Sequence, residues 1–234
     1  SMISHHRGDV KGWNHAWYPD LNGNVWEGGG SETIIEHEFN GFDSGGVPQY
    51  NTTNEYTTPS FWDEVTRIHY NTENDVLYLS GYTPESNNDM PNNVAGTHLQ
   101  RYDNWKGGNR EASYTIELPW DGNQWRSLPP KTWTTAGDYI FTVAVRPANG
   151  ISQLITVFDA NTGDKVGTMS ASEEYGDLGW VDITRGITSY QRSNGEYIVI
   201  VEENGFSKNI VYRWCPSGVC SETLDVELTS PSED

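Results

Sequence analysis

A short pattern that occurs twice in the chain contains the residues best suited to bind a charged ligand. The pattern is Trp-x-Glu/Asp-Val/Ile-Thr-Arg, and its two copies occupy Trp62–Arg67 and Trp180–Arg185. The planar guanidinium groups of Arg67 and Arg185 suit a carboxylate or a sulfate on a substrate. In the structural alternative, the tryptophans pack between repeated units and the acid and arginine tie neighbouring strands together. Repetition favours this alternative, because repeated residues usually serve the repeated unit.

A histidine beside the first copy offers acid–base chemistry. An imidazole can abstract a proton next to the carboxylate of a uronic acid while a guanidinium neutralises that carboxylate. The nearest such set in the sequence is His69 with Arg67 and Tyr70. On a β-strand, however, Arg67 and His69 share one face and Tyr70 lies on the other. These three residues are the candidate catalytic set, although strand alternation separates Tyr70 from the other two.

Tryptophan and tyrosine are frequent, with 10 Trp and 13 Tyr in 234 residues. Their rings have apolar faces and polar edges, which suit sugar rings, and nearby Asp and Asn side chains can bond sugar hydroxyls. Packing in a core is the alternative for most of them. We expect Trp105 to be the most exposed, because no apolar alternation surrounds it. Besides the two arginines, the candidate ligand-binding residues are Trp17, Tyr18, Asp103, Asn104, Trp105, Trp120 and Trp125.

Oxygen-bearing side chains alternate in one early loop. Asp20, Asn22 and Asn24 have the spacing of calcium ligands, but the glycine and glutamate of a helical calcium loop do not follow at their positions. Turns held by Asx hydrogen bonds are the favoured interpretation, and calcium is the alternative. The sequence has no Cys/His zinc spacing and no glycine-rich phosphate loop, so we expect no other cofactor.

Charge and cysteine content restrict the partners and the compartment. The formal charge is −19, from 33 acidic and 14 basic residues, which argues against a nucleic-acid partner. No apolar run is long enough for a membrane span. Cys215 and Cys220 are close enough for a small disulfide, since Pro216 and Gly218 let the chain fold back. Together these features predict a secreted protein, extracellular or periplasmic.

Alternating apolar runs recur along the chain and predict an all-β fold. Runs of this kind begin at Asp75, Asp138 and Glu196, about 60 residues apart. Each belongs to a unit of about four short strands joined by turns. Residues 12–42 are predicted to form an incomplete first unit of three strands.

One strand of the unit has its own pattern, Leu/Ile-x-x-Tyr/Phe-Asp. It occurs at Leu99–Asp103 and at Ile155–Asp159, where Asn161-Thr162-Gly163 follows. This pattern resembles the third strand and turn of β-propeller blades in the quinoprotein-like and related groups. The resemblance implies a propeller of about four four-stranded blades, or half of an eight-bladed ring. It implies no cofactor, because the tryptophan motifs of quinoprotein dehydrogenases are not evident. A β-sandwich is the alternative architecture.

Three ranges divide the chain. Residues 1–11 are predicted to be a tag remnant and a disordered lead, residues 12–228 a single propeller-like domain, and residues 229–234 a disordered tail. A homodimer, or the remainder of a longer chain, would cover the exposed blade faces of a half ring. Carbohydrate recognition is the favoured function. A fragment of a propeller-fold polysaccharide lyase or glycoside hydrolase is the second hypothesis, and a protein-interaction scaffold is the third.

Overall fold

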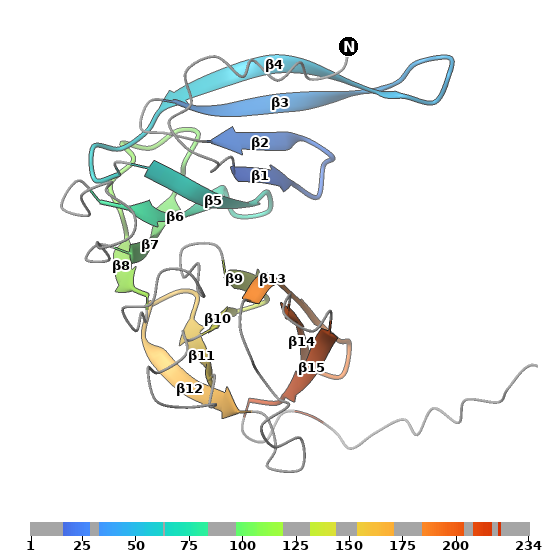
Figure 1. Ribbon diagram of the computed structural model, residues 1–234. Coiled ribbons are helices and arrows are strands. Elements are labelled where there is room, and N and C mark those ends of the chain that lie inside the picture. The colour runs from blue at the N-terminus through green and yellow to red at the C-terminus, as the bar shows by residue number, and fades with distance from the viewer. Residues whose placement is uncertain are drawn as a thin grey trace, which may run out of the picture.

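The computed structural model describes residues 16–28, 33–62, 64–83, 97–118, 132–143, 154–170, 184–203, 208–216 and 220. These residues form fifteen β-strands and no helix, so the protein is all-β, as the sequence predicts. The strands belong to four antiparallel sheets that follow one another along the chain (Figure 1).

Each sheet is a simple meander, in which every strand pairs with the next one in the sequence. The first sheet contains β1 (Ala16–Pro19), β2 (Val25–Gly28), β3 (Thr33–Phe42) and β4 (Pro48–Thr57). The second contains β5 (Glu64–Asn71), β6 (Val76–Tyr82), β7 (Thr97–Asp103) and β8 (Tyr114–Glu117). The third contains β9 (Trp133–Ala136), β10 (Tyr139–Val143), β11 (Leu154–Asp159) and β12 (Lys165–Ser170). The fourth contains β13 (Thr184–Gln191), β14 (Tyr197–Glu203) and β15 (Lys208–Trp214).

The first sheet differs from the expected incomplete unit. It has a fourth strand, β4, which pairs with β3 along most of its length. The β3–β4 hairpin extends well beyond β1 and β2 in Figure 1. Strand β4 is polar and largely exposed, so it lacks the apolar alternation by which a strand is recognised in a sequence.

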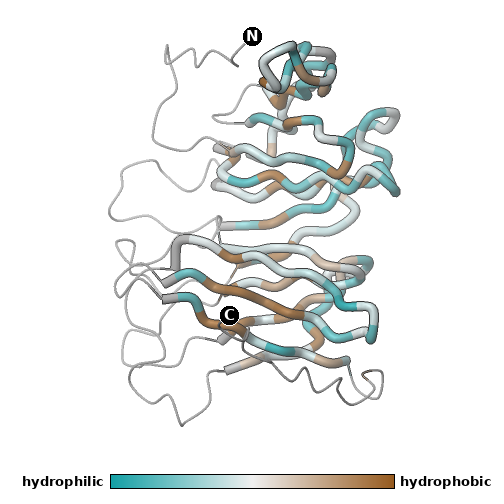
Figure 2. The backbone as a smooth tube through the Cα atoms, turned by 90° about the vertical axis from the view of Figure 1, so that its right-hand side faces the viewer, coloured by the Kyte–Doolittle hydropathy of each residue, from teal (hydrophilic) through white to brown (hydrophobic). Residues whose placement is uncertain are grey.

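The apolar side chains form three cores, each between two consecutive sheets. The first core joins the first and second sheets and includes Trp26, Ile34 and Val65. The second joins the second and third sheets, and the third joins the third and fourth. Both faces of the second and third sheets are therefore covered. In Figure 2, hydrophobic stretches lie along the strands and many of the turns are hydrophilic.

The first strands of the sheets converge near the centre of the molecule. Strand β1 contacts β5, and β9 contacts β13. Two side chains of β5 link this strand to the other two: Arg67 donates to the carbonyl oxygen of Ile187 in β13, and His69 bonds Thr135 in β9. We call this region the hub. The sheets extend outward from the hub, and no core cluster among the described residues joins the first sheet to the fourth. The arrangement is propeller-like but not closed (Figure 1).

Glycine permits the close approach of the first and second sheets. A Cβ atom on Gly28 would lie 2.6 Å from Cδ1 of Ile68, which is buried in the first core. Only a residue without a side chain fits this position of β2 without displacing its neighbour.

Candidate functional site

The hub contains three of the predicted site residues. Arg67 and His69 lie on the same face of β5, and Tyr18 of β1 packs on the His69 ring with 4.2 Å between ring centroids. Thr135 Oγ1 lies 2.7 Å from Nδ1 of His69. The guanidinium of Arg67 lies over the Trp133 ring, 5.5 Å from its centroid, and donates to the carbonyl oxygen of Ile187 at 3.2 Å.

Burial controls the protonation of the hub. It lowers the pKa of His69 to about 3, an effect to which the charge of Arg67 adds. Burial also lowers the pKa of Arg67 to about 10, and it raises the pKa of Tyr18 to about 12, with Asp20 contributing. At neutral pH the hub therefore contains a neutral imidazole and a charged guanidinium. A base with such a low pKa is a poor proton acceptor, so this geometry supports the structural alternative for the first repeated motif.

The third member of the predicted catalytic set lies elsewhere. Tyr70 is on the opposite face of β5, in the first core, where its ring packs against Trp26 at 4.2 Å and its hydroxyl donates to Asp75. The structure thus places Tyr18, and not Tyr70, beside His69. The side chain of Arg185, in the second copy of the motif, lies outside the described residues.

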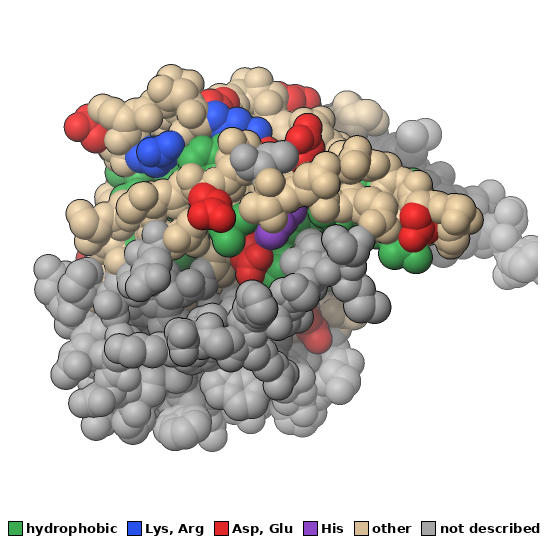
Figure 3. Space-filling model, turned by 90° about the horizontal axis from the view of Figure 1, so that it is seen from above, with side chains coloured by type: hydrophobic (Ala, Val, Ile, Leu, Met, Phe, Trp, Pro, Cys, Tyr) green, Lys and Arg blue, Asp and Glu red, His purple; other side chains and the backbone are tan. Residues whose placement is uncertain are grey.

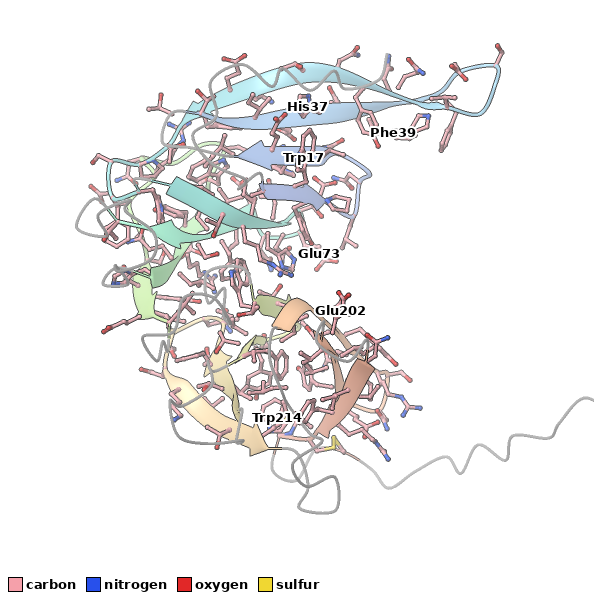
Figure 4. All side chains as sticks on the ribbon, viewed as in Figure 1. Trp17, His37, Phe39, Glu73, Glu202 and Trp214 are labelled. Carbon is pink, nitrogen blue, oxygen red and sulfur yellow. A yellow bond between two sulfur atoms is a disulfide. The ribbon has the colours of Figure 1, made fainter. Side chains whose placement is uncertain are left out.

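A second group of side chains lies on the face of the first sheet that points away from the second sheet. Trp17 of β1 is partly exposed, and its ring is nearly parallel to that of His37 in β3, with 6.2 Å between centroids and an interplanar angle of 12° (Figure 4). Nε2 of His37 lies 2.9 Å from Oε2 of Glu27, and Nδ1 lies 3.2 Å from Oγ1 of Thr52. We call these four residues the Trp17 platform.

The sequence indicated only one member of the Trp17 platform. His37 pairs with Val25 in β2 and with Thr52 in β4, and Trp17 pairs with Glu27. Strand alternation places the four side chains on one face once the register of all four strands is known. Because β4 was not expected, the sequence contained no signal that brings Thr52 beside His37.

The expected exposure of Trp105 is wrong. The residue is completely buried in the first core, with its ring 5.4 Å from that of Tyr102 and 5.5 Å from that of Tyr56. The turn after β7 folds back over the sheet, where the backbone N–H of Trp105 donates to the carbonyl oxygen of Asp75 at 3.0 Å. Trp105 therefore has no free face for a sugar.

Two neighbours of Trp105 are exposed on the same turn. Asp103 accepts a hydrogen bond from Nε of Arg101 at 2.7 Å, and this arginine, together with Ser113, holds its pKa below the ordinary range against the opposing effect of burial. Asn104 has a φ of 50°, and its carbonyl oxygen accepts the N–H of Gly108. Both side chains are accessible, but the aromatic ring that would accompany them is not.

The loop of Asp20 has the geometry of an Asx turn. Oδ1 of Asp20 accepts the backbone N–H groups of Asn22 and Asn24 at 2.9 and 3.0 Å, and Oδ2 accepts Nε1 of Trp26 at 3.0 Å. The side-chain oxygen of Asn24 accepts the N–H of Phe39. The side-chain oxygens of Asp20 and Asn24, two of the three residues proposed as calcium ligands, are thus bonded to protein donors. Across the described ranges, no group of three or more His, Cys, Asp and Glu residues could hold a metal ion.

The remaining predictions concern the ends of the chain and the middle loop. The disulfide between Cys215 and Cys220 is confirmed, with Cα atoms 5.7 Å apart. Trp120 and Trp125 lie outside the described residues. None of the described segments forms a helix that could cross a membrane.

No protein-family model and no curated protein matches the sequence. Among solved structures, the tail fiber of Staphylococcus aureus phage P68 is similar over 86% of this chain, with 11% identity and a TM-score of 0.40, and the match spans 39% of the tail-fiber chain. The GH43 endo-arabinanase from Bacillus licheniformis is similar over 91% of this chain and 98% of its own, with 12% identity and a TM-score of 0.30.

Proposed function

We propose that this protein is an incomplete β-propeller that binds a carbohydrate on the Trp17 platform. The observation that carries the proposal is the parallel stack of Trp17 on His37, with a carboxylate and a hydroxyl at its edge. An indole face packs against the C–H groups of a sugar ring, and the adjacent oxygen atoms can bond its hydroxyls.

The platform is held in place before any ligand arrives. The imidazole of His37 is fixed on both nitrogens, by Glu27 and by Thr52, and its ring lies nearly parallel to the indole of Trp17. The residues belong to strands and not to loops, so little conformational freedom is lost on binding. Glu27 and Thr52 have exposed surface and can exchange water for sugar hydroxyls.

The test is a screen of the protein on a glycan array, followed by calorimetry with the best ligand. Trp17→Ala should lower the affinity for that ligand about tenfold, because the apolar indole face is lost. Tyr190→Ala is the matched control, since Tyr190 is an aromatic residue that is 51% exposed on the fourth sheet. Equal binding by wild type and Trp17→Ala would contradict the proposal, as would the absence of any glycan ligand.

Secretion is part of the same proposal. The disulfide between Cys215 and Cys220 supports an oxidising compartment, because such bonds are rare in the cytosol. Fractionation of the source cells should find the protein outside the cytoplasm, with both thiols blocked to alkylation. Recovery of reduced thiols from the cytoplasmic fraction would contradict this assignment.

Lyase activity on a polyuronate is the second candidate. The observation that favours it is the Glu27–His37 pair, in which a carboxylate orients an imidazole, as in many general bases. The other imidazole nitrogen, Nδ1, faces the hydroxyl of Thr52, so a substrate must displace this hydroxyl to reach the base. Cleavage by elimination would produce an unsaturated uronate, detected as new ultraviolet absorbance. The activity should disappear in His37→Gln, and intact polymer after prolonged incubation with wild-type protein would exclude it.

A further inference from the structure

The loop between β7 and β8 contains two basic residues that lie against the first core. Among the described residues, only one of them pairs with a carboxylate. Lys106 lies over the rings of Trp26 and Tyr70, and its Nζ pairs with the buried carboxylate of Glu36 at 2.6 Å. Arg110 lies over the rings of Tyr56 and Trp105, with 5.2 and 5.3 Å between its Cζ and the ring centroids.

Arg110 has no such carboxylate. Its Nε is buried and has no hydrogen-bond partner, and its guanidinium forms no hydrogen bond or ion pair within the described part of the chain. A buried Nε–H group without an acceptor is costly, because it has lost its hydrogen bond to water and gained none in the protein. It is also unexpected here, since acidic residues outnumber basic ones by 33 to 14.

A second unpaired donor lies beside it. Nε1 of Trp105 is buried without a partner, although the indoles of Trp26, Trp62 and Trp133 donate to Asp20, Tyr102 and Ser80. Buried indole N–H groups usually find an acceptor. Two unsatisfied donors on adjacent side chains indicate a missing acceptor common to both.

The backbone of the loop holds these donors firmly. Two N–H groups of the loop bond Asp75: that of Trp105 donates to its carbonyl oxygen and that of Lys106 to its carboxylate. Gly108 closes the turn onto Asn104, and Arg110 has a φ of 58°, in the left-handed region that few residues other than glycine, asparagine and aspartate adopt. The Arg110 side chain is thus directed over the rings by a fixed loop.

We propose that Arg110 is the centre of a binding site for the carboxylate of a small acidic ligand, such as a uronic acid. A carboxylate matches the planar fork of a guanidinium with two parallel hydrogen bonds. The guanidinium of Arg110 lies over the ring of Trp105, which carries the second unpaired donor. Figure 3 shows Lys and Arg side chains beside hydrophobic ones on one part of the molecule, with acidic side chains close by. The site is independent of the Trp17 platform, because Tyr56 belongs to the opposite face of the first sheet.

The test is a titration of the full chain with sodium glucuronate at constant ionic strength, followed through the tryptophan indole N–H signals by nuclear magnetic resonance. Glucose is the neutral control, and sodium sulfate is the control for a non-planar anion. The signal of Trp105 is the one absent from Trp105→Phe. We expect it to shift saturably with glucuronate, to remain unchanged with glucose, and to respond more weakly to sulfate.

Variants assign the effect to Arg110. Arg110→Gln should weaken the affinity for glucuronate at least tenfold. Arg192→Gln, which changes an arginine in the turn between β13 and β14, should leave this affinity unchanged. If Arg110→Gln does not fold, Arg110→Lys keeps the charge and removes the fork, and it should also weaken binding. Trp17→Ala should have no effect, which separates this site from the proposed sugar platform.

Three results would overturn the inference. The first is the absence of a saturable shift with glucuronate up to tens of millimolar. The second is equal affinity in Arg110→Lys or Arg110→Gln and in wild type. The third is equal binding of sulfate and glucuronate, which would refute the carboxylate assignment.

Discussion

Acidification should destabilise the protein through His69 at pH values above those at which most carboxylates are protonated. The ring lies between Tyr18 and Trp133, and its pKa is lowered to about 3 from the ordinary value of 6.5. Between these two pH values the unfolded chain binds a proton that the folded protein does not. Stability therefore rises with pH in this window, and it falls as the pH drops below 6.5.

The magnitude follows from the width of the window. Each pH unit below 6.5 costs about 1.4 kcal/mol, so the loss at pH 4.5 is about 2 to 3 kcal/mol. This is a large part of the total stability of a typical domain, which is about 5 to 15 kcal/mol. Arg67 contributes to the effect, because its positive charge lowers the pKa of His69 in addition to the lowering caused by burial.

Urea denaturation at several pH values measures the effect. His69→Gln removes the titrating group and keeps a side chain that can bond Thr135, so the free energy of unfolding of this variant should fall less steeply between pH 6.5 and 4.5. The comparison depends on the slopes, and it holds even if the variant is less stable at pH 7. Parallel slopes for the two proteins would refute the assignment of a neutral buried imidazole.

Three further predictions concern stability. Gly108→Ala places a Cβ against the backbone carbonyl oxygen of Asn104, so thermal denaturation should show a loss of about 2 kcal/mol. Trp26→Phe leaves a carboxylate oxygen of Asp20 without its buried indole donor, and urea denaturation should show a loss of about 1 to 3 kcal/mol; an unchanged midpoint would contradict the role of this bond. Two arginines lower the pKa of Glu196, so Glu196→Gln should reduce the melting temperature at pH 7, with a difference from wild type that disappears as the pH falls below the carboxyl's range.

The repeated strands could be predicted because their signal is local. The runs that begin at Asp75, Asp138 and Glu196 correspond to β6, β10 and β14, the second strand of three sheets. These strands are covered on both faces or nearly so, which makes them the most apolar of each unit. Strand β4 has the opposite character: it is an exposed edge strand rich in Gln, Asn and Thr residues. Because it has no apolar alternation, the sequence did not predict it.

The contacts of the candidate sites could not be predicted, because they join residues that are distant in the sequence. Trp105 stands among polar residues, yet contact with Tyr56 on the first sheet buries it completely. His69 meets Thr135 only because β5 and β9 both reach the hub. Neither contact can be predicted from residue type or spacing, because each depends on how consecutive sheets pack against each other.

The serial order of the sheets has a consequence for how the chain acquires its structure. Within the described residues, every strand pairs with its neighbour in the sequence, and each core joins two consecutive sheets. Most of the fold therefore needs only the next segment of the chain to form. Each sheet can therefore form soon after it leaves the ribosome and then serve as a template for the next. The bond from Arg67 to the carbonyl of Ile187 connects positions far apart in the sequence and requires the fourth sheet. We expect assembly of the hub to be the final, slow step of folding.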